Sequence, residues 1–373
     1  MLSKIKLIDL FSGVGGLSYG FSKDSNFEII AANEILPNMA KSYSLNHPDV
    51  KMYCCDIKDL SFKKIKNDLK LNEGDIDLVI GGPPCQAFST VGKRLLEDPR
   101  GKLFQDYYRI IKEVKPKVFI YENVKGLLSM DKGNLINEII NLFKSEGYNV
   151  KYKVLDAANY GTPQHRKRVI IVGNSLNKSF EYPNPTHSER KVSKSLFIDK
   201  TLKPFVTIKD ALSDLPLNSE ISKISDDYLS PPKNDYQKKM REGLTKKIYD
   251  HMPPNNNSKL IQIMKALPQG GTPKDLPENL RPKSGFGNSY SRLWWDRPST
   301  TITRNFSTPS SARCIHPLSP RPLTTREGAR LQGFPDNYIF VGSRSEKNLQ
   351  IGNAVPTFLS FAIKDSVKKL FNK

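Results

Sequence analysis

The stretch Lys6-Leu7-Ile8-Asp9-Leu10-Phe11-Ser12-Gly13-Val14-Gly15-Gly16 decides the fold. A short apolar run passes directly into a glycine turn, and a turn of this kind after a first strand lets the backbone approach a nucleotide-like ligand. Glu34 follows a second apolar run about 20 residues further on, where an acid typically binds ribose hydroxyls. Asp56 follows the expected third strand and could contact an adenine ring.

Apolar runs and amphipathic stretches alternate through the first part of the chain. Alternation of this kind predicts an α/β fold with a Rossmann-like, mostly parallel sheet and helices on both faces. Ligands of such sheets bind at the carboxyl ends of the strands. The runs are Lys6–Leu10, Glu28–Ala32, Asp77–Ile80, Val118–Tyr121 and Val169–Val172, and helical spacing is found in Pro37–Asn46, Phe104–Val114 and Leu135–Glu146.

The composition and periodicity of the sequence change after about Gly173. Residues 175–290 are weakly periodic and rich in Lys, Ser, Asn and Pro. We expect a catalytic domain at 1–173 and 320–373, and a smaller, loop-rich domain at 174–319. Thr324 and Glu327 fit a capping box for a helix through Leu331. A final helix is expected to start near Pro356, a good first-turn residue.

The charge of the chain favours a polyanionic partner. It has 373 residues with 58 Lys and Arg against 38 Asp and Glu, a formal net charge of +20. Such an excess causes self-repulsion, so nucleic acid is the first candidate partner and an anionic membrane surface the second; a lysine-rich composition without a partner is the alternative. Because no apolar run approaches the roughly 20 residues that span a bilayer, and no signal-peptide cleavage site is visible, we expect a cytoplasmic protein without membrane association.

Four cysteines are present, and they show neither a CxxC pair nor Cys/His ligand spacing, so we expect no metal site. Cys54, Cys55 and Cys314 are interpreted as buried, inert small hydrophobes. Cys85 differs, because it lies in the stiff loop Gly81-Gly82-Pro83-Pro84-Cys85-Gln86 that follows a buried strand. A thiol held there, at the ligand edge of the sheet, is a candidate nucleophile if positive neighbours raise its thiolate fraction.

The glycine turn has two competing interpretations. A dinucleotide fingerprint would require glycine at position 18, where the chain has Ser18. S-adenosylmethionine contains adenine and ribose but no pyrophosphate, so it does not need the same phosphate cradle. A plain structural turn is the third possibility, which Glu34 and Asp56 disfavour.

Several ordered motifs resemble those of the cytosine-C5 DNA methyltransferases of bacterial restriction–modification systems. The loop Gly82–Gln86 is similar to the catalytic loop of that family, and Asp9–Gly16 is similar to its cofactor loop. The resemblance covers about 1–173 and 290–373. The other motifs that carry it are Tyr121–Val124, Gln164–Arg168, Arg326–Pro335 and Gly352–Pro356.

The resemblance implies a catalytic set of Cys85, Glu122, Arg166 and Arg168. Cytosine C5 is a poor nucleophile until a thiolate adds to C6, and Cys85 is expected to make that attack. Glu122, if burial raises its pKa, would protonate or hydrogen-bond N3. Arg166 and Arg168 alternate, so on an extended segment they would face one side and hold the base's O2, while Lys167 faces away.

The resemblance also implies an S-adenosylmethionine site and a DNA-binding set. Phe11 is expected to stack on adenine, with Glu34 on ribose and Asp56 and Ile57 at adenine. The target base must be flipped out of the duplex, and residues 87–102 are expected to close over DNA. The other expected cofactor residues are Gly13, Gly15, Gly16, Leu17, Pro83, Leu103, Asn353 and Val355, and the expected DNA-binding residues are Gln86, Ser89, Lys93, Arg94, Arg100 and Gln164.

The resemblance therefore implies an enzyme that methylates cytosine C5 within a short duplex DNA sequence and that pairs with a restriction endonuclease, and we expect it to be a monomer. In the loop-rich region, polar side chains would read base edges in the major groove, and Trp294 and Trp295 are interpreted as packing residues. A tRNA cytosine methyltransferase of the same fold is the near alternative. A catalytically silent DNA-binding protein and a nicotinamide oxidoreductase are the alternatives from other classes.

Overall fold

The structure is a computed structural model of the chain, and it describes residues 3–84, 102–189, 201–218, 226–243, 247–283 and 287–372. The chain divides into two compact units. Unit 1 comprises residues 1–156, 167–184 and 359–373, and unit 2 comprises 157–166 and 185–358. Among the described residues, no helix is both long and apolar enough to cross a membrane.

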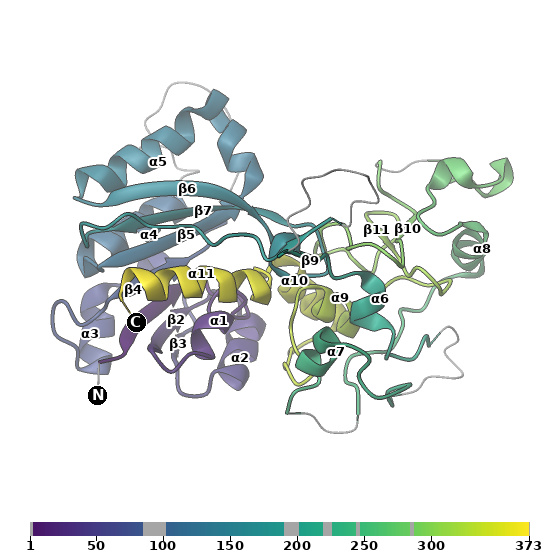
Figure 1. The fold of residues 1–373 in the computed structure, drawn as a ribbon, viewed down its shortest axis with the longest axis horizontal. Helices are drawn as coiled ribbons and strands as arrows, with labels where there is room; N and C mark the ends of the chain where they lie inside the picture. The colour runs from purple at the N-terminus through teal and green to yellow at the C-terminus, as the bar shows by residue number, and fades with distance from the viewer. Residues whose placement is uncertain are drawn as a thin grey trace. The chain divides into compact units, whose positions relative to one another are not determined.

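Unit 1 is built on a seven-stranded sheet with the order β3-β2-β1-β4-β5-β7-β6 (Figure 1). The first five strands pair in parallel, whereas β7 runs antiparallel to both β5 and β6. The mostly parallel α/β sheet predicted from the alternating pattern is confirmed. The strands are β1 (Ile5–Leu10), β2 (Phe27–Asn33), β3 (Lys51–Tyr53), β4 (Leu78–Gly81), β5 (Val118–Val124), β6 (Asn149–Asp156) and β7 (Lys167–Asn174).

Helices cover both faces of this sheet, as predicted. One face buries Ile8 and Leu10 of β1 beneath α3, α4 and α5, in a cluster that includes Phe104 and Phe143. On the other face, Gly20 of α1 donates its backbone N–H to Ser360 Oγ of α11 at 2.9 Å. The helices of unit 1 are α1 (Tyr19–Ser22), α2 (Pro37–Asn46), α3 (Phe62–Leu69), α4 (Lys102–Val114), α5 (Asn134–Ser145) and α11 (Thr357–Leu370), with the 3-10 turns η1 (Ile57–Asp59) and η3 (Lys125–Gly133).

Unit 2 contains short elements joined by long loops. The capping box predicted for its helix α9 is present, because Thr324 Oγ1 accepts from the backbone N–H of Glu327 while the Glu327 carboxylate accepts from that of Thr324. The helices are α6 (Ile208–Leu212), α7 (Asp235–Met240), α8 (Ser258–Ala266), α9 (Thr325–Leu331) and α10 (Arg344–Asn353), with 3-10 turns at Ala157–Tyr160, Pro273–Asp275 and Glu278–Leu280. Two small sheets pair β8 (His187–Ser188) with β9 (Lys203–Pro204) and β10 (Ser291–Arg292) with β11 (Arg313–Ile315).

The compact units differ from the expected domain boundaries, because residues 174–184, expected with the loop-rich domain, fall in unit 1. Residues 157–166 and 320–358 were expected with the catalytic domain, but they fall in unit 2. The reason is visible at α9, where His251 Nδ1 lies 2.9 Å from Thr324 Oγ1 and Arg330 Nη1 donates to the carbonyl of Ala211 at 2.7 Å. The N-cap and the last turn of α9 are thus held by loop-rich segments.

Cys54, Cys55 and Cys314 were interpreted as buried, inert residues. This interpretation is correct in burial for Cys314, which is fully buried, and wrong for Cys54, which is exposed. Cys54 directly follows β3, the edge strand of the sheet, so one side of it has no neighbouring strand. Cys55 is half-buried and packs against the unit 1 core.

Candidate functional site

The glycine loop follows β1 with a backbone that few side chains tolerate. Phe11, Gly13 and Gly15 all have positive φ, at 54°, 55° and 86°. A Cβ built on Gly13 would meet nothing within 4 Å, so the backbone conformation rather than space demands glycine there. The loop therefore leaves an open cradle beside its backbone at the carboxyl end of β1.

Glu34 anchors this loop from the end of β2. Its Oε2 accepts from the Gly13 backbone N–H at 2.9 Å, and its Oε1 accepts from the Leu36 N–H at 2.9 Å. Glu34 is buried, and burial raises the pKa of its carboxyl above the usual value, although these backbone N–H groups oppose the rise. Glu34 thus joins two adjacent strand ends, at the position where the sequence predicts a ribose contact.

Asp56 lies at the end of β3 and caps the short turn η1. Its Oδ1 accepts from the Lys58 backbone N–H at 3.1 Å, and this hydrogen bond, with the nearby Lys58 ammonium, lowers the pKa of Asp56. Asn33 donates its side-chain N–H groups to the carbonyls of Tyr53 and Cys55, at 3.0 and 2.9 Å. Asn33 therefore holds β2 and β3 so that Glu34 and Asp56 emerge from neighbouring strand ends.

The residues of this edge fit a ligand that contains adenine and ribose. Two acids, Glu34 and Asp56, follow neighbouring strands, and an open glycine cradle lies beside them. Ser12 is buried, and its Oγ has no hydrogen-bond partner among the described residues. A buried hydroxyl without a partner is costly, so a polar ligand group is expected next to it.

The remaining expected cofactor residues of unit 1 are distributed around the same strands. Phe11 and Leu103 are partly buried and pack against the core cluster, whereas Leu17 and Ile57 are buried. Gly16 and Pro83 are also buried. Their contacts with a cofactor stay predictions.

Glu122 and Arg168 form an ion pair on two neighbouring strands. Arg168 Nε lies 2.8 Å from Glu122 Oε1, and about a tenth of each side chain is exposed. A Cβ built on Gly82 would lie 2.7 Å from Glu122 Oε2. A side chain at position 82 would therefore displace the Glu122 carboxylate from its present position.

Asn123 is a residue that the sequence reasoning missed. Its Nδ2 donates to the carbonyl of Pro83 at 3.0 Å, so β5 holds the start of the Gly82–Gln86 loop directly. The signal was its position, immediately after Glu122 within the quoted Tyr121–Val124 motif. The nucleophile candidate Cys85 lies outside the described residues, as do Gln86, Ser89, Lys93, Arg94 and Arg100.

In unit 2, Gln164 and Arg166 bind protein groups. Gln164 donates to the carbonyl of Leu331 at 2.8 Å and to Gln332 Oε1 at 2.7 Å, and its Oε1 accepts from the Ile302 N–H. Gln164 is fully buried, so no polar atom of its side chain is exposed for the expected DNA contact. A motif match identifies a residue, but it does not show whether the hydrogen-bonding groups of its side chain are already paired within the protein.

Arg166 is likewise buried, and it fixes two backbone segments of unit 2. It donates to the carbonyls of Ile302 and Gly352, each at 2.8 Å. Arg166 directly precedes β7 and its carbonyl accepts from the Ala157 N–H at 3.1 Å, while Arg168 lies within β7, so their expected joint contact with the base stays a prediction. Lys167 is exposed, as predicted.

The end of α10 carries the last expected cofactor residues. Asn353 is exposed and Val355 is buried. A Cβ built on Gly352 would lie 2.3 Å from the Arg304 backbone nitrogen, so glycine permits a close backbone approach there. Trp294 is a packing residue, as predicted, because its ring lies against Gly270 and 4.3 Å from the guanidinium of Arg313.

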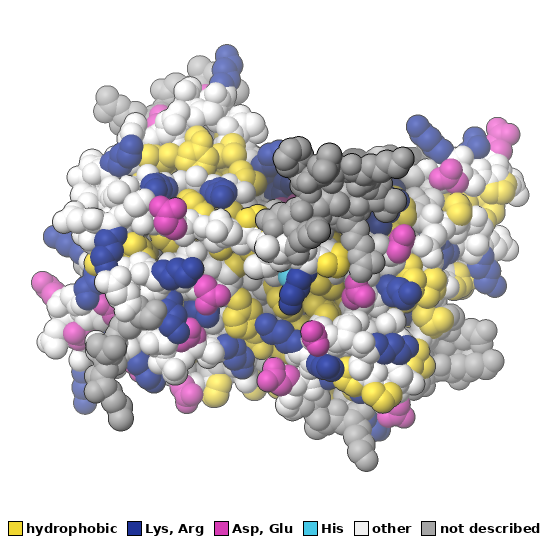
Figure 2. Space-filling model, viewed as in Figure 1, with side chains coloured by type: hydrophobic (Ala, Val, Ile, Leu, Met, Phe, Trp, Pro, Cys, Tyr) yellow, Lys and Arg dark blue, Asp and Glu magenta, His cyan; other side chains and the backbone are white. Residues whose placement is uncertain are grey.

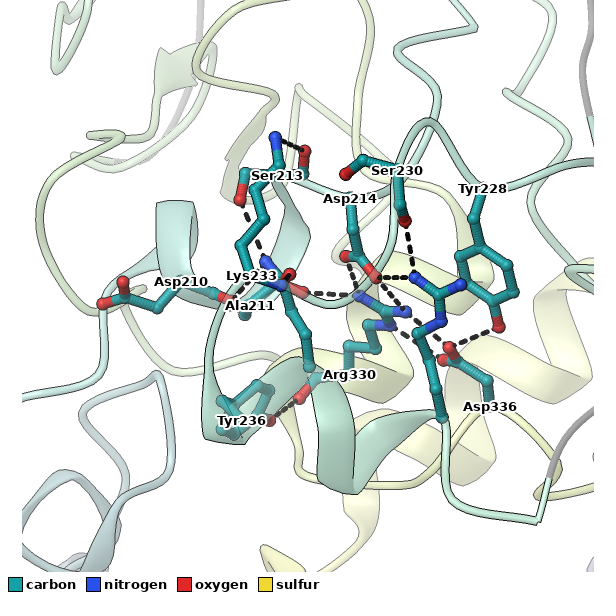
Figure 3. Close-up of polar contacts among 12 residues, drawn as sticks. Asp210, Ala211, Ser213, Asp214, Tyr228, Ser230, Lys233, Tyr236, Arg330 and Asp336 are labelled. Atoms are coloured by element: carbon teal, nitrogen blue, oxygen red, sulfur yellow. Dashed lines mark hydrogen bonds and ion pairs between the residues drawn. The ribbon is translucent and has the colours of Figure 1, made fainter.

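Figure 3 shows a buried ionic cluster in unit 2, centred on Arg330 of α9. Arg330 Nη1 lies 2.5 Å from Asp214 Oδ1, and Arg330 Nη2 lies 2.5 Å from Asp336 Oδ2. Arg241 pairs with Asp214 at 3.2 Å and stacks on Tyr228, whose hydroxyl donates to Asp336 at 2.8 Å. The carboxylates raise the pKa of Arg330, although burial alone would lower it. Each buried charge here has an opposite partner.

Comparison with known proteins identifies the family of this chain. The chain matches the C-5 cytosine-specific DNA methylase family over residues 5–369. It is 34% identical to the Type II methyltransferase M.AgeI of Thalassovita gelatinovora, covering 98% of this chain and 99% of that one. It is 35% identical to the Type II methyltransferase M.DdeI of Desulfomicrobium norvegicum, covering 98% and 89%.

Solved structures show the same fold. A DNA modification methyltransferase encoded within an E. coli prophage superposes with a TM-score of 0.77 at 28% identity, covering 99% of this chain and all of that one. The Dnmt2 methyltransferase of S. pombe, at 20% identity, superposes with a TM-score of 0.61 and shares the fold. The chain belongs to the C-5 cytosine-specific DNA methylase family. It is a DNA cytosine-5 methyltransferase.

Proposed function

We propose that this enzyme transfers the methyl group of S-adenosylmethionine to C5 of a flipped cytosine within one short duplex DNA sequence, and that Cys85 is the nucleophile. The observation that carries the proposal is the Glu122–Arg168 pair, packed against Gly82 at the start of the Gly82–Gln86 loop. That loop carries Cys85. A carboxyl group and a guanidinium next to Gly82, three residues before Cys85 in the sequence, suit nucleophilic addition to a pyrimidine ring.

The proposed reaction has four steps. The Cys85 thiolate adds to C6 of cytosine, while Glu122 hydrogen-bonds or protonates N3 and so accepts the charge that develops on the ring. The electron pair released to C5 would take the methyl group that S-adenosylmethionine, held by Glu34 and the glycine loop, would supply. A base then removes the C5 proton, the ring expels Cys85 as a thiolate, and a proton on N3 returns to Glu122. In this scheme Arg168 orients Glu122 and stabilises anionic groups nearby.

The chain's own residues would hold the cofactor at the carboxyl edge of the sheet. In this proposal Glu34 binds ribose, Asp56 and Ile57 border adenine, and the glycine loop accommodates the methionine portion. S-adenosylmethionine supplies an electrophilic methyl group on a positively charged sulfur. The remaining work of the protein is to bind the cofactor, exclude water and orient the base.

Duplex DNA is the proposed acceptor, and protection from a cognate restriction endonuclease is the proposed role. The net charge of +20 supports a polyanionic partner. On the face shown in Figure 2, Lys and Arg side chains are spread over the surface rather than gathered in one patch. The expected DNA contacts of Gln86, Ser89, Lys93, Arg94 and Arg100 belong to this proposal.

Bisulfite sequencing of mixed-sequence duplex DNA, treated with the enzyme and S-adenosylmethionine, tests the function. Methylated cytosines are expected at one short motif with the wild-type chain and at none with Cys85→Ala. Cys54→Ala is the matched control, because Cys54 is an exposed thiol elsewhere in the chain, and it is expected to retain activity. Methylation of tRNA with no methylation of duplex DNA would overturn the proposal.

A further inference from the structure

Arg109 is a cation of unit 1 that the proposed mechanism does not use. It lies in the middle of α4, and 33% of its side chain is exposed. Its Nη2 donates to the backbone carbonyl of Ile57 at 2.8 Å, and its Nη1 donates to that of Leu60 at 3.0 Å. Ile57 begins the 3-10 turn η1, and Leu60 directly follows it. One guanidinium therefore binds both ends of this turn.

Two acids of α4 fix the guanidinium in that position. Asp106 Oδ1 lies 3.2 Å from Arg109 Nη2, and Glu113 Oε1 lies 3.1 Å from Arg109 Nη1. The acids are three residues before and four residues after Arg109, so the three side chains share one face of the helix. The planar fork of arginine serves these carboxylates and two carbonyls at once, whereas the single ammonium of a lysine cannot span them.

Glu113 extends this contact to the start of the next helix. Its Oε2 accepts from the Phe62 backbone N–H at 2.8 Å. Phe62 is the first residue of α3, where backbone N–H groups have no partners within the helix. The Arg109–Glu113 pair thus binds the backbone at three positions between Ile57 and Phe62, and this attaches the segment to one face of α4.

The turn η1 depends on such an anchor because it is short. It spans three residues, and 3-10 turns have poorer hydrogen-bond geometry than α-helices. On the other side of the turn, Asn33 of β2 donates to the carbonyl of Cys55 at 2.9 Å. Asp56, which caps η1, therefore lies between two anchors, one in β2 and one in α4.

The carboxylate that this turn presents suits the amino group of an adenine ring. Asp56 is half-buried, and the backbone N–H and the ammonium of Lys58 lower its pKa, so at neutral pH it is ionised and only accepts hydrogen bonds. Adenine carries an exocyclic amino group that donates hydrogen bonds. An acceptor that is held in one place distinguishes adenine from a purine without that group, whereas an acceptor on a loosely held turn does so poorly.

We propose that Arg109 is the positioning residue for the adenine end of the cofactor site: it clamps η1 to α4 and so holds Asp56 where it recognises the amino group of adenine. This inference rests on the proposed use of S-adenosylmethionine, with Asp56 bordering its adenine. Arg109 binds backbone carbonyls and acids of the chain, so it acts through the turn. Its loss should weaken ligands that carry the amino group and spare ligands that lack it.

A second ion pair of α4 supplies the matched control. Lys112 Nζ lies 3.0 Å from Glu146 Oε1, and Glu146 is the C-cap residue of α5. This pair joins α4 to α5, whereas the Arg109 pairs join α4 to η1. Removal of the Lys112 charge therefore breaks an ion pair of the same helix without releasing the turn.

Isothermal titration calorimetry on the intact chain tests the inference with two ligands, S-adenosylhomocysteine and its analogue in which unsubstituted purine replaces adenine. Arg109→Met, which removes the donors, is expected to bind S-adenosylhomocysteine about tenfold more weakly, the effect of losing one hydrogen bond to a charged group. Its affinity for the purine analogue should change less than about twofold. A residue needed only for the fold would weaken both ligands equally.

Two further variants and a second measurement sharpen the test. Arg109→Lys keeps a positive charge beside Asp106 and Glu113 but lacks the fork, so it should weaken S-adenosylhomocysteine by about threefold. Lys112→Met should match the wild type with both ligands. Without any ligand, the backbone amides of residues 57–62 should exchange hydrogen about tenfold faster in Arg109→Met and at the wild-type rate in Lys112→Met.

The outcomes separate this inference from the proposed function. Equal weakening of both ligands in Arg109→Met, or unchanged binding of S-adenosylhomocysteine, would overturn the role of Arg109 and leave the proposed cofactor in place. If the wild-type chain binds neither ligand, the proposed cofactor is wrong and the inference fails with it. Faster hydrogen exchange in Arg109→Met would then show a clamp on η1 that does not serve this ligand.

Discussion

Two groups of buried charges in this protein are arranged in opposite ways. In unit 2, Arg330 lies between Asp214 and Asp336, and Arg241 and Tyr228 complete their hydrogen bonding. In unit 1, Asp9 and Glu34 are buried next to a glycine loop, and no cation among the described residues pairs with either. A compensated cluster holds segments of chain together. An uncompensated pair makes the folded state costlier wherever the pH ionises both acids.

The largest effect should come from breaking the compensated cluster. Arg330→Met leaves Asp214 and Asp336 buried without their cation, and removal of one partner from a buried pair costs about 3–5 kcal/mol. Urea denaturation should show that loss. Arg241→Met is the control with a smaller expected loss, because Arg330 still faces both carboxylates. A loss for Arg330→Met below that for Arg241→Met would show that the cluster is not centred on Arg330.

The next largest effect concerns a charge pair at the proposed catalytic site. Glu122→Gln keeps the side-chain shape but removes the acid, and loss of an acid–base group typically lowers a rate by about 10²–10⁴-fold. Single-turnover methylation should show this loss while cofactor affinity remains near that of the wild type. If the methylation rate falls less than about tenfold, Glu122 does not act on the base.

The uncompensated pair predicts a stability that depends on pH. The folded-state pKa of Asp9, about 7, lies above its unfolded value, so the folded chain holds a proton that the unfolded chain has already lost. In the absence of cofactor, the free energy of unfolding should therefore fall as pH rises from about 4 to about 7. Asp9→Asn should remove that part of the decline and melt at a higher temperature than the wild type at pH 8. The pH dependence of thermal unfolding checks this, and an equal decline in both proteins would contradict it.

The smallest expected effect is the difference in unfolding free energy between losing a buried helix N-cap and losing an exposed one. Thr324→Ala removes a fully buried cap that also contacts His251, and should cost about 1–2 kcal/mol. Ser343→Ala removes the matching cap of α10, which is exposed, and should cost about 0.5–1 kcal/mol. Chemical denaturation of both variants compares them. Equal losses would show that burial adds nothing to this type of cap.

The sequence was informative where local chemistry specifies structure. The glycine turn after Leu10, the capping box at Thr324 and the helix after Pro356 each depend on residues near in sequence, and all three are present. The edge strand β6 was not predicted. Its central residues, Lys151, Tyr152 and Lys153, are exposed, so its sequence lacks the apolar run that identified the inner strands.

The sequence identified which residues belong to the candidate site, but it did not show which of them contact one another. The family motifs named Glu122 and Arg168, but their pairing depends on β5 and β7 lying side by side in antiparallel register. The burial of Gln164 depends on Leu331 and Gln332, more than 160 positions away. Asp9 was quoted within a motif, yet its missing counter-charge becomes visible only when every neighbour is in place.

The hydrogen bond between Gly20 and Ser360 spans 340 positions of the chain. The ribosome makes the amino-terminal part of the chain first. Helix α1, which follows the glycine loop, therefore lacks its contact with Ser360 until α11 has been synthesised. A nascent chain cut short before α11 would therefore carry every proposed cofactor residue and still lack the Ser360 hydroxyl that binds Gly20. We therefore expect truncation before α11 to abolish the proposed cofactor binding even though every motif remains.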